Sequence, residues 1–192
     1  PEAPGIAYIG SSGEDRIQTA VVLADYYDQA KLLAADYFFV HGVGSNSGGG
    51  ADTRGIAFDA HQRMYFVGRA PASVLQYDVS VDEVGQVRRA LLSGVDTCRQ
   101  ATAIVVVPAG EETYVVVSCF NERTIQVNRA DPSLSLVATV SVGRGPAAMA
   151  ISPDGGRIYV ANYLDDTLAI VDTVPGSPTQ FRVVMRMGVP RE

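Results

Sequence analysis

Short apolar runs separated by polar turns recur along this chain, and the pattern is clearest in residues 143–171. Two apolar runs, at 147–152 and 157–162, flank the tetrad Pro-Asp-Gly-Gly at 153–156. Proline presets φ and glycine accepts positive φ, so this tetrad is a strong reverse-turn signal. A third apolar run, at 167–172, follows two aspartates. The pattern predicts a small antiparallel meander of three strands joined by tight turns.

The same arrangement recurs in residues 55–79 and 101–127, and in part at 6–23. Each of the three complete units has a tyrosine in its second apolar run and a glycine 29 residues after that tyrosine. The tyrosines are 45 to 49 residues apart, a period that fits four short strands with their turns. The pairs are Tyr65 with Gly94, Tyr114 with Gly143, and Tyr159 with Gly188.

Four-stranded units of this length stack radially into a β-propeller, in which each sheet buries its faces against its neighbours. Burial of both faces explains strands that are almost continuously apolar, such as 104–107 and 114–117. We therefore predict an all-β fold, a β-propeller of four-stranded antiparallel blades with about four blades represented. The predicted units are a partial blade at 1–44 and blades at 45–94, 95–143 and 144–192.

Residues 152–173, SPDGGRIYVANYLDDTLAIVDT, resemble the YVTN-type β-propeller repeat, similar to surface-layer and lactonase-like propellers. The SPDG turn and the IYVAN core are the most specific parts of this resemblance. The second unit departs from it, because residues 59–62 (Asp-Ala-His-Gln) replace the turn. The resemblance implies a seven-bladed ring, of which this chain is a part. A four-bladed ring, closed by pairing of the two ends of the chain, is the alternative.

Composition narrows the classes of function. A net charge of −6 argues against a nucleic-acid-binding protein, because phosphate binding needs a basic surface. No apolar run approaches the length of a membrane-spanning helix. His41 and His61 are the only histidines and do not have metal-ligand spacing. Neither cysteine begins a haem attachment motif, and no nucleophile elbow is present. We therefore predict no catalytic set, metal or cofactor.

Cys98 precedes the first strand of the third unit, and Cys119 ends its second strand. Adjacent antiparallel strands bring these two positions to the same edge of the blade, within the roughly 7 Å between Cα atoms that a disulfide allows. We predict a Cys98–Cys119 disulfide, with two buried free thiols as the alternative. A disulfide indicates an oxidising location, namely the periplasm, the cell surface or the exterior.

Arg54, Arg99 and Arg144 occur at intervals of 45 residues, each next to the start of a first strand. In a propeller these connections line one mouth of the central channel. Three guanidinium groups converging there would form a rim that binds carboxylate or phosphate. The alternative is that they form ion pairs with nearby acids such as Asp52 or Asp96, or simply face water.

The sequence favours an exported, non-enzymatic propeller that acts as a scaffold for binding a protein or a ligand. Its expected partners are another protein or further blades of the same protein, with an anionic ligand at the channel mouth. One alternative, suggested by the resemblance, is a lactonase-like hydrolase or a periplasmic redox propeller whose catalytic residues lie outside these units. A structural subunit of a larger assembly is the other.

Overall fold

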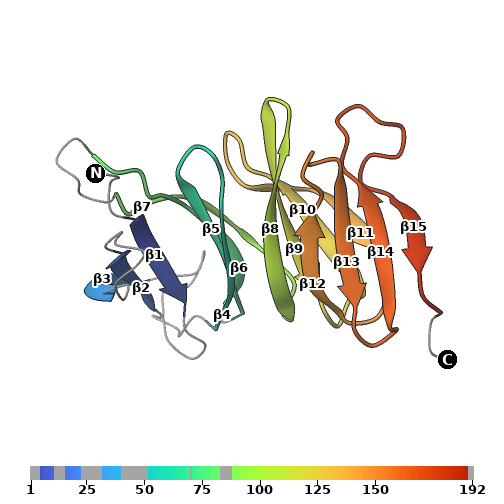
Figure 1. Cartoon of the computed structure of the whole chain (residues 1–192), viewed down its shortest axis with the longest axis horizontal. Coiled ribbons are helices and arrows are strands. Elements are labelled where there is room, and N and C mark those ends of the chain that lie inside the picture. Colours follow the sequence, from blue (N-terminus) through green and yellow to red (C-terminus); the bar gives the residue numbers. More distant parts are fainter. Residues whose placement is uncertain are drawn as a thin grey trace, which may run out of the picture.

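The computed structural model describes residues 5–10, 16–22, 32–39, 52–69, 71–82 and 88–189. In the first three ranges it describes the backbone and, of the side chains, that of Tyr8. Every regular element in these ranges is a strand, and the strands form four antiparallel sheets (Figure 1). The predicted all-β class is confirmed. His41 lies outside the described residues.

The strands have the following bounds. The first sheet contains β1 (Gly5–Gly10), β2 (Arg16–Val22) and β3 (Leu32–Phe39). The second contains β4 (Thr53–Phe58), β5 (Arg63–Arg69), β6 (Ala72–Asp78) and β7 (Ala90–Asp96). The third contains β8 (Ala101–Ala109), β9 (Glu112–Cys119), β10 (Thr124–Arg129) and β11 (Ser135–Ser141). The fourth contains β12 (Pro146–Ile151), β13 (Arg157–Asn162), β14 (Thr167–Asp172) and β15 (Val183–Met187).

Within each sheet the strands pair in the order of the chain, so each sheet is a meander. The first strands of successive sheets lie against one another: β1 contacts β4, β4 contacts β8, and β8 contacts β12. The sheets therefore stack around their first strands, as Figure 1 shows for the second to the fourth sheet. This is the β-propeller arrangement, with the first strand of each blade nearest the axis.

The strand register shows that the tyrosines and glycines used to detect the repeat do not all occupy equivalent positions. Cys119 pairs with Thr124, and Asn162 pairs with Thr167, across hairpins of equal length. Counted from these hairpins, Tyr159 matches Val116, whereas Tyr114 matches Arg157. The glycines are displaced in the same way, because Gly94 lies within β7 while Gly188 follows β15. Tyr65 does match Tyr159, because Gly68 pairs with Ser73 as Asn162 pairs with Thr167. The repeat is therefore real, but Tyr114 and the three glycines are not at equivalent positions, and unequal connections between strands produced the constant offset of 29 residues.

The core consists of three apolar layers between successive sheets. Residues alternate along each central strand, so one set faces the preceding sheet and the other faces the following sheet. Between the second and third sheets lie Tyr65, Val67, Val74, Ile104, Val115 and Val117. Between the third and fourth sheets lie Val116, Ile125, Val127, Ile158, Val160 and Val171. Met64, Phe66 and Leu75 form the layer facing the first sheet, together with Tyr8.

The predicted reverse turn between β12 and β13 forms as the sequence indicates. The Gly155 amide donates to the carbonyl of Ser152 over 2.9 Å, and Asp154 accepts the Gly156 amide over 3.0 Å. Gly155 has a φ of 71°, and an added Cβ would lie 3.0 Å from the carbonyl oxygen of Pro108 in the third sheet. Glycine is required here by both conformation and space.

Candidate functional site

Arg54, Arg99 and Arg144 lie at the same end of their sheets, where the first strands β4, β8 and β12 begin. We call this the arginine end of the molecule. It also carries the hairpins between the second and third strands of each sheet. Arg99 and Arg144 occupy equivalent positions, two residues before Ala101 and Pro146, which pair with Cys119 and Asn162. Arg54 is displaced into β4, one residue after Thr53.

Arg144 is held by the β13–β14 hairpin of its own sheet. Its Nε donates to Asp165 over 2.5 Å, and its backbone amide donates to the other oxygen of the same carboxylate over 2.6 Å. The backbone amide of Arg144 comes first among the hydrogen bonds and charges that lower the pKa of Asp165. The arginine is thus fixed in place, and 36% of its side chain remains exposed.

The other two arginines differ from each other in their surroundings. Arg54 pairs with Asp52 over 2.6 Å, which is the ion-pair alternative raised for this residue. Asp52 also lies 3.9 Å from Arg69 at the end of β5. Arg99 is exposed, beside the disulfide. Of the three predicted arginines, Arg54 and Arg144 therefore share their charge with aspartates, and Arg99 is an exposed cation.

Two further side chains at this end were missed by sequence reasoning. Tyr163 and Leu164, in the β13–β14 hairpin, are 70% and 46% exposed. The Tyr163 amide donates to Gly145, and the Leu164 carbonyl accepts Nη2 of Arg144. An apolar pair inside an otherwise polar turn, NYLDDT, was the available signal. Exposed tyrosine beside arginine is a combination enriched in protein interfaces.

The predicted disulfide is present. Cys98 and Cys119 are bonded, with Cα atoms 5.7 Å apart. Ala101 pairs with Cys119 across the first two strands of the third sheet, so the bond fastens the β7–β8 connection to the end of β9. Glu122 lies close to both sulfur atoms. Because the sulfurs are bonded to each other, they do not offer the thiolates that a zinc site needs.

A cleft of about 510 Å³ opens at the opposite end, between the β4–β5 turn and the β8–β9 hairpin. Phe58, Val106 and Pro108 supply apolar walls, and His61, Glu111 and Glu112 supply polar groups. Asp59 also lines the cleft, but its carboxylate is bound by Arg63, by the Tyr65 hydroxyl and by two backbone amides. Burial would raise the pKa of Asp59, and these hydrogen bonds outweigh it and lower the pKa. Asp59 is therefore an ionised structural group.

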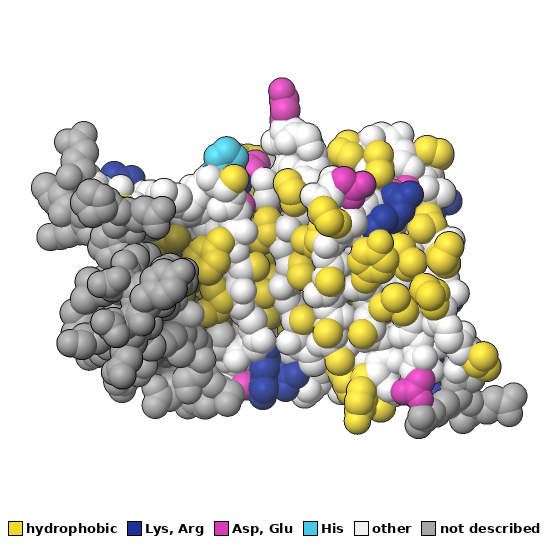
Figure 2. All heavy atoms as spheres, in the orientation of Figure 1, with side chains coloured by type: hydrophobic (Ala, Val, Ile, Leu, Met, Phe, Trp, Pro, Cys, Tyr) yellow, Lys and Arg dark blue, Asp and Glu magenta, His cyan; other side chains and the backbone are white. Residues whose placement is uncertain are grey.

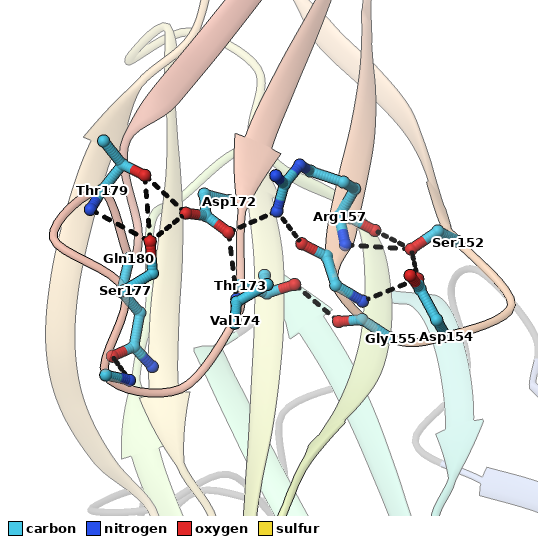
Figure 3. A network of polar contacts seen from close by, with 12 residues as sticks. Ser152, Asp154, Gly155, Arg157, Asp172, Thr173, Val174, Ser177, Thr179 and Gln180 are labelled. Atoms are coloured by element: carbon cyan, nitrogen blue, oxygen red, sulfur yellow. Dashed lines mark hydrogen bonds and ion pairs between the residues drawn. The ribbon is translucent and has the colours of Figure 1, made fainter.

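A second carboxylate network holds the same end of the fourth sheet. Figure 3 shows Asp172 between Arg157 on one side and Ser177 and Thr179 on the other. The Asp172 side chain is 2% exposed. Burial alone would raise its pKa, but the two hydroxyls, the Val174 amide and Arg157 together lower it to about 2. This network fixes the β14–β15 connection.

The comparisons with known proteins identify the fold. No family model and no curated protein sequence matches the chain. Among solved structures, a candidate 6-phosphogluconolactonase from Bacteroides fragilis has a TM-score of 0.71 at 16% identity, over 97% of this chain and 56% of that one. A periplasmic gluconolactonase from Pseudomonas aeruginosa has a TM-score of 0.68 at 20% identity, over 97% and 52%. Sqt1 from Chaetomium thermophilum, bound to the N-terminus of a ribosomal protein, has a TM-score of 0.61 at 13% identity, over 95% and 46%.

These similarities establish a β-propeller fold, and at such identities they establish the fold alone. The chain spans about half the length of these solved structures. In the described ranges, no helix has the length and hydrophobicity to cross a lipid bilayer.

Proposed function

We propose that this protein is an exported, non-enzymatic propeller scaffold that binds an acidic partner at its arginine end. The observation that carries the proposal is the recurrence of arginine beside three consecutive first strands, at one end of the molecule. Asp165 orients Arg144 next to the exposed Tyr163 and Leu164. A positioned arginine beside an exposed aromatic side chain suits a carboxylate-bearing peptide. The protein-bound state of Sqt1 is a structural precedent for such binding.

Two observations support export. A buried disulfide persists in oxidising compartments, and one of the similar structures is a periplasmic protein. We also propose that the chain carries repeats of the YVTN type, on the basis of the SPDG turn and the IYVAN core in residues 152–162. That assignment accords with recognition at a cell surface.

The binding proposal is tested by fluorescence anisotropy with a labelled glutamate-rich peptide. Replacing Arg54, Arg99 and Arg144 together by alanine should weaken binding roughly tenfold at low salt, and the difference should shrink as salt screens the charges. The matched control replaces Arg88, Arg129 and Arg182, which lie at the opposite end, and has the same net charge. Equal loss in both variants, or unchanged binding in the first, would contradict the proposal.

A lactone hydrolase is the second candidate, favoured by the similarity to gluconolactonases and by the cleft that contains His61. The test is hydrolysis of gluconolactone, monitored through the acid that it releases in weakly buffered solution. A rate above the uncatalysed one that is lost in His61→Ala would favour this candidate. A rate equal to that of buffer alone would leave the scaffold as the better assignment.

A further inference from the structure

The outer side of the fourth sheet carries an apolar surface that faces away from the third sheet. Pairing across β12 to β15 places its members on one side, because directly opposed residues of antiparallel strands share a face. Figure 2 shows hydrophobic side chains gathered over this sheet. We call this surface the open face; its residues are Ala150, Tyr159, Leu168, Ile170, Met185 and Met187.

The matching positions of the third sheet are covered. By register, Tyr159 matches Val116, Leu168 matches Ile125, and Met187 matches Val140. The first two of the third-sheet residues are completely buried and Val140 is 6% exposed, because the fourth sheet packs on them. Met187, in contrast, is 52% exposed. The open face therefore repeats a surface that is an interface one sheet earlier.

One position at the border of these surfaces contacts the next sheet in both complete interfaces, and it indicates which side chain a further sheet would place there. Arg63, Tyr114 and Arg157 are equivalent by register, at or near the start of the second strand. Arg63 donates two hydrogen bonds to Asp131, in the β10–β11 connection of the following sheet. Tyr114 packs edge-on against Phe181, in the β14–β15 connection of the sheet that follows it, with ring centroids 4.9 Å apart. In both cases the residue contacts the connection between the third and fourth strands of the next sheet.

Arg157 can make the same kind of contact with the third-to-fourth strand connection of a further sheet. Its guanidinium bonds to Gly156 and Asp172 both come from Nη1. Among the described residues Nε and Nη2 make no hydrogen bond, and 39% of the side chain is exposed. A guanidinium edge of two parallel N–H groups matches a carboxylate. The contact made by Arg63 shows that a carboxylate in the next sheet's connection satisfies this position.

We propose that the open face docks a fifth four-stranded blade of the same propeller ring, which brings a carboxylate in its third-to-fourth strand connection to Arg157. The solved structures that this chain resembles are about twice its length, with room for further blades. An uncovered apolar face of this size is otherwise unusual on a folded protein. The inference does not depend on the arginine end.

The test uses the chain's own blades as probes. Gly188 matches Asp96 and Ser141 by register, so residues 1–188 are continued either by a second copy of residues 97–143 or by a second copy of residues 142–189. The first copy supplies an aspartate at the position of Asp131, and the second has valine at the equivalent position, that of Val174. A thiol at Met185→Cys reports cover of the open face, since both native cysteines are bonded. The copied Cys98 and Cys119 of the first extension are replaced by alanine, so that they add no thiol. Leu92→Cys, on β7, is the control site.

In both extended chains the thiol at position 185 should react at least about tenfold more slowly than in the unextended chain, because labelling then requires local opening. The thiol at position 92 should react equally in all three. Arg157→Gln should restore part of the reactivity only in the chain with the added aspartate, and replacing that aspartate by asparagine should have the same effect. Two extensions are used so that one misfolded copy does not decide the result.

Unchanged labelling in both extended chains would overturn the proposal. An equal effect of Arg157→Gln in the two chains would overturn its carboxylate part. The unextended chain should remain a monomer of 20.3 kDa by light scattering. A stable dimer in which the position 185 thiol is protected would assign the open face to a second copy instead, and would also overturn the proposal.

Discussion

The interface between the second and third sheets and the interface between the third and fourth sheets have the same packing but different contacts at their borders. Between the third and fourth sheets the contact is an apolar layer, with Tyr114 against Phe181 at its edge. Between the second and third sheets a similar apolar layer is bordered by polar links. Gln76 donates to the Ala130 carbonyl and accepts the Ser93 hydroxyl, and Arg63 reaches Asp131.

The comparison shows that the two interfaces share the apolar layer and differ in the polar contacts at its border. Both interfaces place β-branched and aromatic side chains at the same alternating positions of the central strands, because burying that stripe drives association of the sheets. The polar links come from β5, β6 and β7 of the second sheet and reach the β10–β11 connection of the third. They add geometric selectivity between neighbouring sheets and contribute less net free energy than the apolar layer.

The largest expected effect comes from emptying the apolar layer. Ile158 is completely buried between the third and fourth sheets, so Ile158→Ala should lower the free energy of unfolding by about 2–5 kcal/mol through lost transfer energy and a cavity. Urea unfolding followed by circular dichroism measures it. Val184→Ala, at an exposed position of β15, should change stability by less than about 0.5 kcal/mol. Equal effects in the two variants would contradict the assigned core.

Removing the disulfide should act on the other interface. Cys98 and Cys119 belong to the layer between the second and third sheets, and their bond closes a loop with a separation of 21 residues. The double variant Cys98→Ser and Cys119→Ser should be less stable by about 2–4 kcal/mol. In non-reducing conditions the parent should show no free thiol. A parent that reacts with a thiol reagent when unfolded without reductant would disprove the bond.

The polar links should have smaller and unequal effects. Arg63→Met leaves the carboxylate of Asp59, which is 4% exposed, without its guanidinium partner, and should cost about 1–3 kcal/mol. Asp131→Asn removes an exposed partner of the same arginine and should cost less than about 1 kcal/mol. Thermal unfolding of both variants makes the comparison. A larger loss of stability for Asp131→Asn would show that Arg63 is held mainly by Asp131 of the third sheet, and would contradict the prediction.

Acid should weaken the fourth sheet through Asp172. Its pKa of about 2 lies below the ordinary value of 3.8, so its ionised form stabilises the folded state above pH 4, and that contribution is lost as the pH falls from about 4 to 2. The midpoint of thermal unfolding should therefore fall across this window. Asp172→Asn should start from a lower midpoint and show a shallower fall. An identical slope in the variant would show that other carboxylates govern acid sensitivity.

The fold class and the repeating meander could both be predicted from the sequence. Alternating apolar stripes and turn chemistry are local properties, and the SPDG turn forms for the reasons visible in its residues. The Cys98–Cys119 disulfide was also predictable, because adjacent antiparallel strands fix which positions lie opposite each other. The candidate site was predictable only in part. The end of the sheets that holds Arg54, Arg99 and Arg144 followed from strand order.

The strand register and the partners of individual side chains could not be predicted, because they depend on how the strands and sheets meet in three dimensions. A bulge or a longer connection shifts strand positions without changing the apolar pattern, so Tyr114 proved equivalent to Arg157 and not to Tyr159. The pairing of Arg144 with Asp165, and of Arg63 with an aspartate 68 residues away, depends on how hairpins and sheets meet. The exposed state of Tyr163 and of the open face has the same origin. Burial is set by what packs on a strand, and the strand's own residues do not specify its neighbour.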